Sequence, residues 1–332
     1  MNALLQVSQL TVSYRNGNGR ETTAAAGVSF SINTGEAVGL LGESGCGKTT
    51  TALALLRLLP VNARVIGGEV IYRDRNLLDL QEKDLARIRG AEVSFVFHEP
   101  SVALNPVLRV GGQISEVLRA HRSWSRRRCR AETEGLLEQV GLSDGAVLYD
   151  AFPHELSGGQ KQRILIAQAL ACKPSLIIAD EPTTGLDTHT QSEILELLKD
   201  LKLRLQTAFL FISHHPGVLA RLADRLLVMY AGRIVEEGGL AQVYEQPKHP
   251  YTRGLLGATP GKHAGPDQGR RLVQIPGSLP DMSNLPGGCA FAPRCPLRMD
   301  VCAEEAPQER MLDCGRRVSC HACTDALDGS RK

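Results

Sequence analysis

The sequence predicts an α/β fold built on a mainly parallel sheet. Strand-like and helix-like segments alternate over residues 157–237, and a glycine-rich loop joins a strand to a helix over residues 37–59. The chain has 332 residues, of which 42% are hydrophobic and 22% charged, as in ordinary globular proteins. This length suits one large domain with an appendage, or two domains.

The N-terminal part reads as short strands followed by a helix. The runs LLQVSQLTVSY (4–14), GVSFSI (27–32) and AVGLL (37–41) are strand-like, and Gly- and Asn-rich turns separate them. A helical pattern then begins at Lys48 and continues through TTTALALLRLL. These residues predict the order strand, glycine loop, helix.

The middle of the chain is predicted to be mostly helical over residues 107–155. Its basic stretch, RSWSRRRCR at Arg122–Arg130, is interpreted as a solvated helix face or loop. From residue 157 the pattern predicts helix 157–171, strand 175–180, helix 192–205, strand 208–213 and a hairpin over 226–237.

The character of the sequence changes after about residue 245. Residues 259–271, TPGKHAGPDQGRR, are typical of a linker, and the remainder is rich in Pro and Cys. Six of the nine cysteines follow residue 288, whereas Cys46, Cys129 and Cys172 are scattered. In a reducing compartment such clustering favours a metal over disulfides.

Charge and hydropathy restrict the possible partners and location. The net charge of +2 gives no whole-molecule reason to expect a nucleic acid partner. The N-terminus lacks the basic start and long apolar core of a signal peptide, and no run approaches the ~20 apolar residues that span a bilayer. We therefore expect a soluble, cytoplasmic protein.

A phosphate-binding motif lies between the predicted strand 37–41 and the helix that follows it. Residues Gly42–Thr49, GESGCGKT, fit the pattern G-x-x-x-x-G-K-[ST]. The glycines allow successive backbone N–H groups to face phosphate oxygens, and the helix N-terminus adds partial positive charge. Lys48 is expected to reach the β- and γ-phosphates, and the Thr49 hydroxyl is expected to bind Mg²⁺. Cys46 occupies a variable position of the motif and is interpreted as filler.

Two further motifs complete a nucleotide site. Asp180 and Glu181 end the strand LIIA, at the sheet edge where α/β proteins bind ligands. Asp180 can hold Mg²⁺, and Glu181 can polarise the attacking water. The segment LSGGQ then opens a helix at Ser157 with exposed N–H groups, which is either a second anion site or a plain serine N-cap.

Taken together, GESGCGKTT, LSGGQ, IIADEPTTGLD and the histidine after AFLFIS resemble the nucleotide-binding subunit of ABC transporters, over about residues 1–240. The resemblance implies a P-loop ABC nucleotide-binding domain with a RecA-like core, an antiparallel β subdomain and a helical subdomain at about residues 100–165. In this family two such subunits close on two ATP molecules, and their closure and reopening drive a membrane partner.

The resemblance also implies roles for single residues. Tyr14 matches the aromatic that stacks on adenine, Asp187 matches the D-loop, and His214 matches the switch histidine near the γ-phosphate. The signature residues Ser157, Gly158, Gly159 and Gln160 match those that contact ATP held by the opposite protomer. The remaining nucleotide-binding residues are expected to be Gly42, Ser44, Gly45, Cys46, Gly47, Lys48, Thr49 and Thr50.

Two histidines depart from the family pattern. His98 stands where the family has a glutamine that reaches magnesium and water, and His215 follows His214 where an aspartate is usual. An imidazole can bind a metal or a water, but it is shorter and can become charged near neutral pH. His98 is therefore a candidate catalytic residue, expected to be neutral beside Mg²⁺, or else the loop simply tolerates histidine. Glu181 and His214 are intact, which favours hydrolysis over binding alone.

The segment KHPYTRGLL at residues 248–256, Ile275–Gly277 and the later cysteines resemble the C-terminal extension of dipeptide and oligopeptide importer ATPases. That resemblance implies a [4Fe-4S] cluster on Cys289, Cys295, Cys302 and Cys320. A Zn²⁺ site that uses Cys320, Cys323 and Cys314 or an earlier cysteine is the alternative. Free or disulfide-bonded thiols remain open, and the metal's role is expected to be structural.

The combined interpretation is an ABC nucleotide-binding domain at 1–244 and a small Cys-rich extension at 245–332. The expected function is ATP hydrolysis, with Mg²⁺, that powers import of di- or oligopeptides. Nickel or another small solute, a non-transport ABC ATPase and a regulatory ATP-binding module remain alternatives. The expected partners are two transmembrane permease subunits, a second ATP-binding subunit and an extracytoplasmic peptide-binding protein, which would place the chain on the cytoplasmic face of the membrane.

Overall fold

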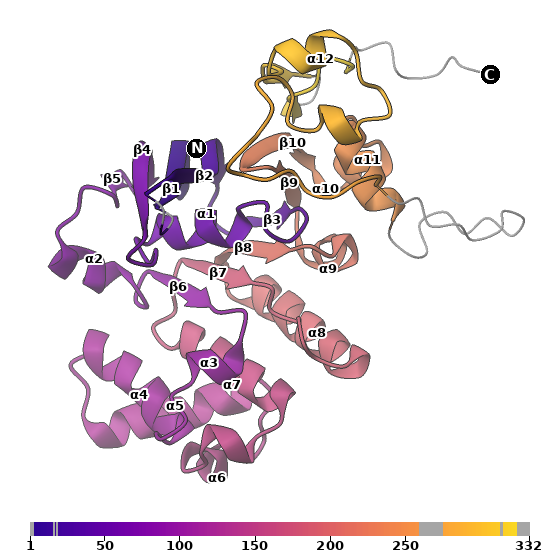
Figure 1. Ribbon diagram of the computed structural model, residues 1–332. Helices are drawn as coiled ribbons and strands as arrows, with labels where there is room; N and C mark the ends of the chain where they lie inside the picture. Colours follow the sequence, from indigo (N-terminus) through magenta and orange to yellow (C-terminus); the bar gives the residue numbers. More distant parts are fainter. Residues whose placement is uncertain (1–2, 16, 18, 259–274, 313–314, 324–332) are drawn as a thin grey trace, which may run out of the picture. The chain divides into compact units, whose positions relative to one another are not determined.

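The computed structural model describes residues 3–15, 17, 19–258, 275–312 and 315–323 (Figure 1). The predicted linker at 259–271 and Cys314 lie outside this range. The chain forms two compact units, each taken on its own below. Of the described residues, unit 1 contains Ala3, 32–37 and 79–212, and unit 2 contains those of 4–31, 38–78 and 213–323.

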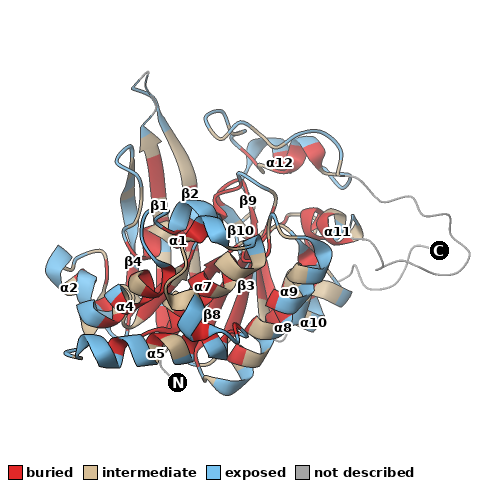
Figure 2. Cartoon of the chain, turned by 90° about the horizontal axis from the view of Figure 1, so that it is seen from below, coloured by how far each residue is buried: buried red, intermediate tan, exposed pale blue. Residues whose placement is uncertain are grey.

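Unit 1 is organised around three parallel strands, β6 (Val93–Val96), β7 (Leu176–Asp180) and β8 (Ala208–Ser213). β7 lies in the middle and pairs with both neighbours. Every residue of β7 and β8 is buried, and buried residues are drawn in red in Figure 2. Their continuous apolar runs are what parallel strands covered on both faces require.

Helices make up the rest of unit 1, and the predicted helical subdomain is confirmed. α4, α5, α6 and α7 pack on one another (Figure 1). The predicted basic stretch lies in a loop and the first turn of α5, where Arg126 and its neighbours are exposed, as a solvated face should be. The helices of the unit are α2 (Glu82–Ile88), α3 (Pro100–Ala103), α4 (Val110–His121), α5 (Arg126–Gln139), α6 (Gly145–Tyr149), η1 (Pro153–Glu155), α7 (Gly158–Leu170) and α8 (Thr188–Arg204).

Unit 2 holds the predicted antiparallel sheet, which has the strand order β2-β1-β4-β5. Leu5, Val7, Leu10 and Val12 of β1 are buried, and the polar residues between them are more exposed, so one face of this sheet supplies core. A register shift between Ser8 and Thr11 marks a bulge in β1. The strands are β1 (Leu5–Arg15), β2 (Glu21–Ile32), β4 (Ala63–Tyr72) and β5 (Arg75–Asn76).

A second set of strands in unit 2 begins with β3 (Ala37–Leu41), which runs parallel to β9 (Arg225–Tyr230). β9 and β10 (Arg233–Gly239) form the predicted hairpin. Two short strands of the C-terminal extension continue the sheet, because β12 (Arg317–Val318) pairs with β10 and β11 (Arg310–Met311) pairs with β12. Helices α1 (Lys48–Leu55), α9 (Pro216–Leu222) and α10 (Leu240–Glu245) complete this part.

Charged pairs join the extension to the rest of unit 2. Arg316 pairs with Glu236 of β10, and the exposed fractions of the two side chains are 6% and 0%. Arg317 and Arg225 both pair with Glu237 of β10. Removing one partner of a buried ion pair typically costs about 3–5 kcal/mol, because it leaves the other charge uncompensated. The helical segments of the extension are α11 (Pro250–Gly257), η2 (Ala292–Arg294) and α12 (Val301–Glu304).

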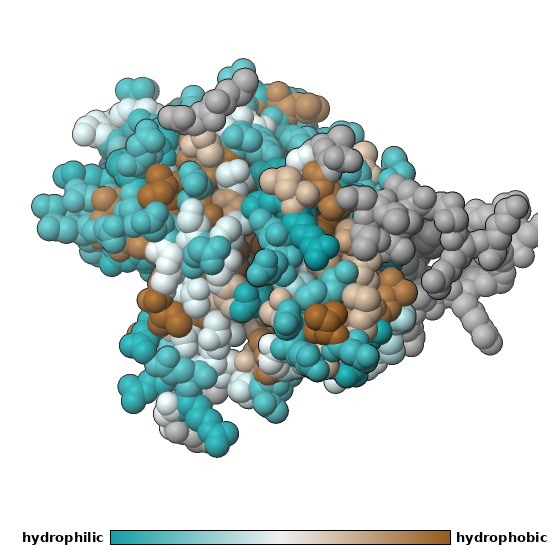
Figure 3. Space-filling view, turned by 90° about the horizontal axis from the view of Figure 1, so that it is seen from above, coloured by the Kyte–Doolittle hydropathy of each residue, from teal (hydrophilic) through white to brown (hydrophobic). Residues whose placement is uncertain are grey.

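The surface is mostly hydrophilic on the face shown in Figure 3, where the apolar side chains form only scattered spots. Within the described ranges, the helices are too short or too polar to cross a lipid bilayer.

His249, the N-cap residue of α11, generates a prediction about pH. It is 2% exposed, its Nδ1 accepts a hydrogen bond from the Tyr251 N–H at 3.0 Å, and burial lowers its pKa to about 3. In the unfolded chain a histidine takes up a proton below pH ~6.5, whereas the folded form stays neutral until about pH 3. The stability supplied by the neutral form is therefore complete above pH ~6.5 and is lost as the pH falls toward 3.

Between pH 7 and pH 5 we expect the native chain to lose about 2 kcal/mol more unfolding free energy than the His249→Asn variant. Asparagine can still cap the helix, but it cannot titrate. Denaturant unfolding of both proteins at the two pH values measures this difference. Equal losses would show that His249 protonates freely in the folded chain.

Candidate nucleotide site

The phosphate-binding loop of unit 2 connects the buried strand β3 to helix α1. The Lys48 ammonium is buried and donates hydrogen bonds to the carbonyl oxygens of Gly42 at 2.8 Å and Glu43 at 2.9 Å. Ser44, Gly45 and Thr49 are exposed on the loop and the first turn of the helix. The loop thus offers a lysine and a helix N-terminus to an anion, as the motif requires.

Close packing of the loop explains two of its glycines. A Cβ on Gly42 would lie 2.3 Å from the Met229 carbonyl oxygen, and one on Gly47 would lie 2.2 Å from that of Ala24. Gly47 also has a φ of 107°, which side-chain-bearing residues rarely adopt. Cys46 is buried, and burial raises the pKa of its thiol, which agrees with its interpretation as filler.

Glu43 is a residue of this loop that the sequence interpretation passed over. Its N–H donates to the Tyr251 hydroxyl at 2.9 Å. Its carboxylate accepts from both terminal nitrogens of Arg294, at 2.8 and 3.0 Å. No local signal could have revealed these contacts, because Glu43 stands at a variable position of the motif and its partners lie more than 200 residues away.

Tyr14 lies on β1 of the same unit, and its hydroxyl shares a hydrogen bond of 3.1 Å with Thr50 of α1. This contact fixes the aromatic ring beside the helix that follows the loop. Unit 2 therefore brings together the loop and the residue expected to stack on adenine. His214 follows β8, and its ring lies 3.9 Å from that of His215, centroid to centroid.

In unit 1 the two acidic candidates lie at the end of β7. Asp180 is buried as the last residue of the strand. Glu181 has a positive φ of 48°, its N–H donates to the Ile212 oxygen at 3.0 Å, and its carboxylate accepts from the Thr184 hydroxyl at 3.0 Å. A left-handed conformation at a glutamate is uncommon and tends to persist at functional sites.

The LSGGQ segment forms a capping box at the start of α7. Ser157 Oγ accepts from the Gln160 N–H at 3.2 Å, and the Gln160 side chain accepts from the Ser157 N–H at 2.9 Å. A Cβ on Gly159 would lie 2.5 Å from Thr190 Cγ2, so glycine allows α7 and α8 to approach. Ser157 and Gly158 stay exposed, which leaves this helix N-terminus accessible to an anion.

Asp187 and His98 are the other candidates in unit 1. Asp187 caps α8 by accepting from the His189 and Thr190 N–H groups. A hydrogen bond from the Thr190 hydroxyl, at 2.7 Å, contributes most to lowering the Asp187 pKa. His98 lies just after β6, is partly exposed, and has its Nδ1 3.9 Å from a carboxylate oxygen of Glu99.

The four cysteines expected to bind a cluster lie in unit 2. Burial raises the pKa of Cys289, Cys295 and Cys320, and smaller increases come from other thiols: Cys302 for Cys289, Cys289 and Cys302 for Cys295, and Cys295 and Cys323 for Cys320. Across the described residues, however, His, Cys, Asp and Glu side chains form no group of three or more that could hold a metal ion. The described residues therefore give no geometric support for the cluster, and Cys314 of the alternative zinc site lies outside them.

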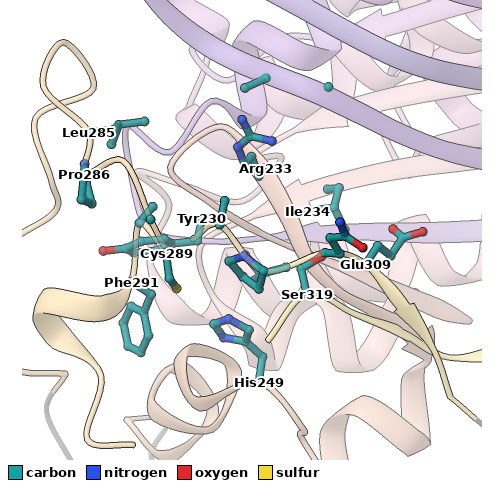
Figure 4. A pocket seen from close by; sticks show the side chains of 18 of the residues that line it. Tyr230, Arg233, Ile234, His249, Leu285, Pro286, Cys289, Phe291, Glu309 and Ser319 are labelled. Carbon is teal, nitrogen blue, oxygen red and sulfur yellow. The ribbon is translucent and has the colours of Figure 1, made fainter. Parts of the chain in front are cut away.

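Cys289 also borders a cavity of about 450 Å³ in unit 2. Tyr230, His249 and Phe291 line the same cavity, and their rings are visible around it in Figure 4.

Two family models match parts of the chain. Residues 25–184 match the model of the ABC transporter family, and residues 235–302 match that of the oligopeptide/dipeptide transporter C-terminal region. The first range ends just after Glu181, and the second contains three of the four candidate cluster cysteines.

Similar proteins align over nearly the whole chain. The oligopeptide transport ATP-binding protein OppD of Escherichia coli is 42% identical, with 98% of this chain and 95% of that protein covered. The dipeptide transport ATP-binding protein DppD of Bacillus subtilis is 41% identical, with coverage of 96% and 95%. A probable peptide ABC transporter ATP-binding protein, y4tR of Sinorhizobium fredii, is 43% identical, with coverage of 92% and 91%.

A solved structure extends the likeness to three dimensions. The dimeric ATP-binding cassette MJ0796, in a post-hydrolysis state bound to ADP and Pi, matches with a TM-score of 0.64 and 28% identity, over 71% of this chain and 98% of that one. The predicted cassette fold is confirmed. The chain belongs to the ABC transporter ATP-binding family, in the branch that carries the oligopeptide/dipeptide transporter C-terminal region.

Proposed function

We propose that this chain is the ATP-hydrolysing subunit of an ABC importer for di- or oligopeptides. The observation that carries the proposal is the full-length similarity to peptide-transport ATP-binding proteins, together with a P-loop whose lysine is buried against the loop carbonyls. The match of residues 235–302 to the peptide-transporter C-terminal region favours peptides over other solutes.

The residues at the site divide the work of hydrolysis. Lys48 and the N–H groups of the loop bind the phosphates, and Tyr14 packs on the adenine. Thr49 and Asp180 carry oxygen ligands of the kind that Mg²⁺ prefers, and the bound ion would neutralise charge on the phosphates. Glu181 accepts a proton from the attacking water, and His214 contacts the γ-phosphate. His98 would position the water or the ion from its loop.

A second cassette supplies the remaining contacts. The Ser157 helix start is exposed and carries backbone N–H groups, so it can bind phosphate held by a facing subunit. Asp187 lies on the loop that precedes α8 in the same unit, and it holds that loop through its capping bonds. We infer that the facing subunit is a sister ATP-binding protein.

Exposed apolar side chains mark where a permease would contact unit 1. Phe97, Val102, Val107 and Leu108 lie within one short segment after β6, and their exposed fractions are 42%, 77%, 75% and 45%. Exposed apolar groups gathered in one segment are typical of an interaction site. Contact with two transmembrane subunits, which receive peptide from an extracytoplasmic binding protein, would place the chain at the cytoplasmic face of the membrane.

Glu181→Gln is expected to lower the rate of phosphate release by at least about 100-fold while ATP binding is retained, because the amide cannot accept the proton from water. Phosphate release and nucleotide binding by the purified chain, with and without Mg²⁺, measure both effects. An unchanged rate would rule out Glu181 as the base. Binding without phosphate release in the native chain would favour a regulatory module instead.

Val102→Asp is expected to leave the ATPase rate of the isolated subunit unchanged and to reduce, several-fold, the stimulation by permeases in proteoliposomes, since it places a charge in an apolar contact. Leu203→Asp is the matched control, because Leu203 is 74% exposed on α8, outside this segment. Equal loss in both variants, or none in Val102→Asp, would contradict the proposed contact.

For the extension we keep the [4Fe-4S] cluster on Cys289, Cys295, Cys302 and Cys320 as a proposal. Its support is that these four cysteines are the ones implied by the resemblance to the extension of peptide-importer ATPases, and that thiolates are the ligands of such clusters. The cluster would tie together a segment that has few core residues.

Protein purified without oxygen is expected to be brown, with about four iron and four sulfide per chain, and Cys320→Ser is expected to lose most of the iron. Cys172→Ser is the control, because Cys172 is a buried cysteine of unit 1. A colourless protein with one zinc per chain would support the zinc site instead. Absence of both metals would leave free thiols.

A further inference from the structure

The phosphate-binding loop and the C-terminal extension meet at Glu43. The backbone N–H of Glu43 donates to Tyr251 of α11, and its carboxylate is bound by Arg294 of η2. Its carbonyl oxygen accepts from Lys48. Three separate groups of one loop residue are thus fixed, and the extension supplies the partners of its N–H and of its carboxylate.

Arg294 is itself held rigidly. Its side chain is 6% exposed, its Nε donates to the Pro276 oxygen at 2.9 Å, and its guanidinium lies 5.8 Å from the centroid of the Tyr230 ring. Both terminal nitrogens are directed at Glu43, which is the two-pronged arrangement that favours arginine over lysine. Little freedom is left for this pair to separate while the extension stays in place.

An aromatic cluster keeps the extension beside the loop. The Tyr251 ring centroid lies 4.6 Å from that of Tyr230 on β9 and 5.5 Å from that of Phe291 in the extension. Tyr251 is 0% exposed, and His249 packs against Phe291 at 5.8 Å. Three of these rings also line the cavity in Figure 4. Tyr251 and Arg294 therefore contact Glu43 from an extension that packs against β9 through these rings.

The charge of Glu43 matters because it belongs to a loop that binds phosphate. A carboxylate in that loop repels a triphosphate unless a cation neutralises it, and repulsion is strong where water is partly excluded. The Glu43 side chain is only 26% exposed, so solvent screens it incompletely. Arg294 supplies the neutralising charge.

We propose that Arg294 is a positioning residue for ATP. It neutralises the Glu43 carboxylate. Together with Tyr251, it also fixes the phosphate-binding loop at Glu43, so that the extension contributes to nucleotide affinity. This inference rests on the proposed function, since it requires that the loop binds ATP.

The test compares ATP affinity among variants of the full-length chain, by fluorescence titration with a nucleotide analogue and by the KM for ATP. Arg294→Met is expected to weaken ATP binding by about tenfold or more, because Glu43 is left as an uncompensated charge. Adding Glu43→Gln in the double variant is expected to restore affinity to within about threefold of the native chain, since the repelling charge is gone. Arg294→Lys is expected to fall between these values.

Arg298→Met is the matched control, because Arg298 is exposed in the same segment, and it is expected to bind ATP as the native chain does. Loss of affinity in Arg294→Met that the double variant does not recover would mean that Arg294 is merely structural. Native affinity in Arg294→Met would overturn the proposal. If the native chain binds no ATP, the proposed function fails first.

If Arg294→Met does not fold, Tyr251→Phe tests the same loop through another atom. It keeps the ring in the aromatic cluster and removes only the hydroxyl that accepts from the Glu43 N–H. A two- to fivefold weaker affinity for ATP, with a thermal midpoint close to that of the native chain, is expected if this bond shapes the loop. Unchanged affinity would contradict the positioning role.

Discussion

The close approach of backbone to backbone around the phosphate-binding loop is the constraint on which the rest of unit 2 depends. A Cβ on Gly47 would clash with the carbonyl oxygen of Ala24. The N–H of Gly232, in the β9–β10 turn, donates to the Cys46 oxygen at 2.9 Å. The Gly232 oxygen in turn accepts from the Ala26 N–H at 2.8 Å. The loop is therefore packed between strand β2 and the β9–β10 turn.

The candidate groups of both units stand where strands end or helices begin. Asp180 ends a strand whose residues are all buried, whereas Ser157 and Asp187 begin helices. The rigid strand fixes the position of the carboxylate, and the helix starts present backbone N–H groups that need an acceptor. The capping side chains use part of that capacity, while the glycines after Ser157 keep the backbone open to a ligand.

Local patterns explain how much could be predicted. The strands, the hairpin at Tyr230–Arg233 and the glycine loop follow from apolar runs and turn residues within a few positions. The contact of Glu43 with Arg294 spans 251 residues, and the pairing of β12 with β10 joins Glu236 to Val318. Such contacts depend on how an extension with little periodicity folds back, which spacing along the chain does not encode. The thiols illustrate the same limit, because the resemblance to the importer extension suggested cluster ligands but not their geometry.

Buried ion pairs, together with the aromatic cluster around Tyr251, bind the extension to the rest of unit 2. Glu236 is 1% exposed and accepts from the N–H groups of Lys248 and His249 as well as pairing with Arg316. Without those donors, a carboxylate in this position would be buried and uncompensated, at a cost greater than one surface ion pair could offset. Glu43 stands in the same relation to Arg294. Carboxylates of the nucleotide-binding part are thus neutralised by arginines of the extension. Without the extension, these carboxylates would lack their compensating charges.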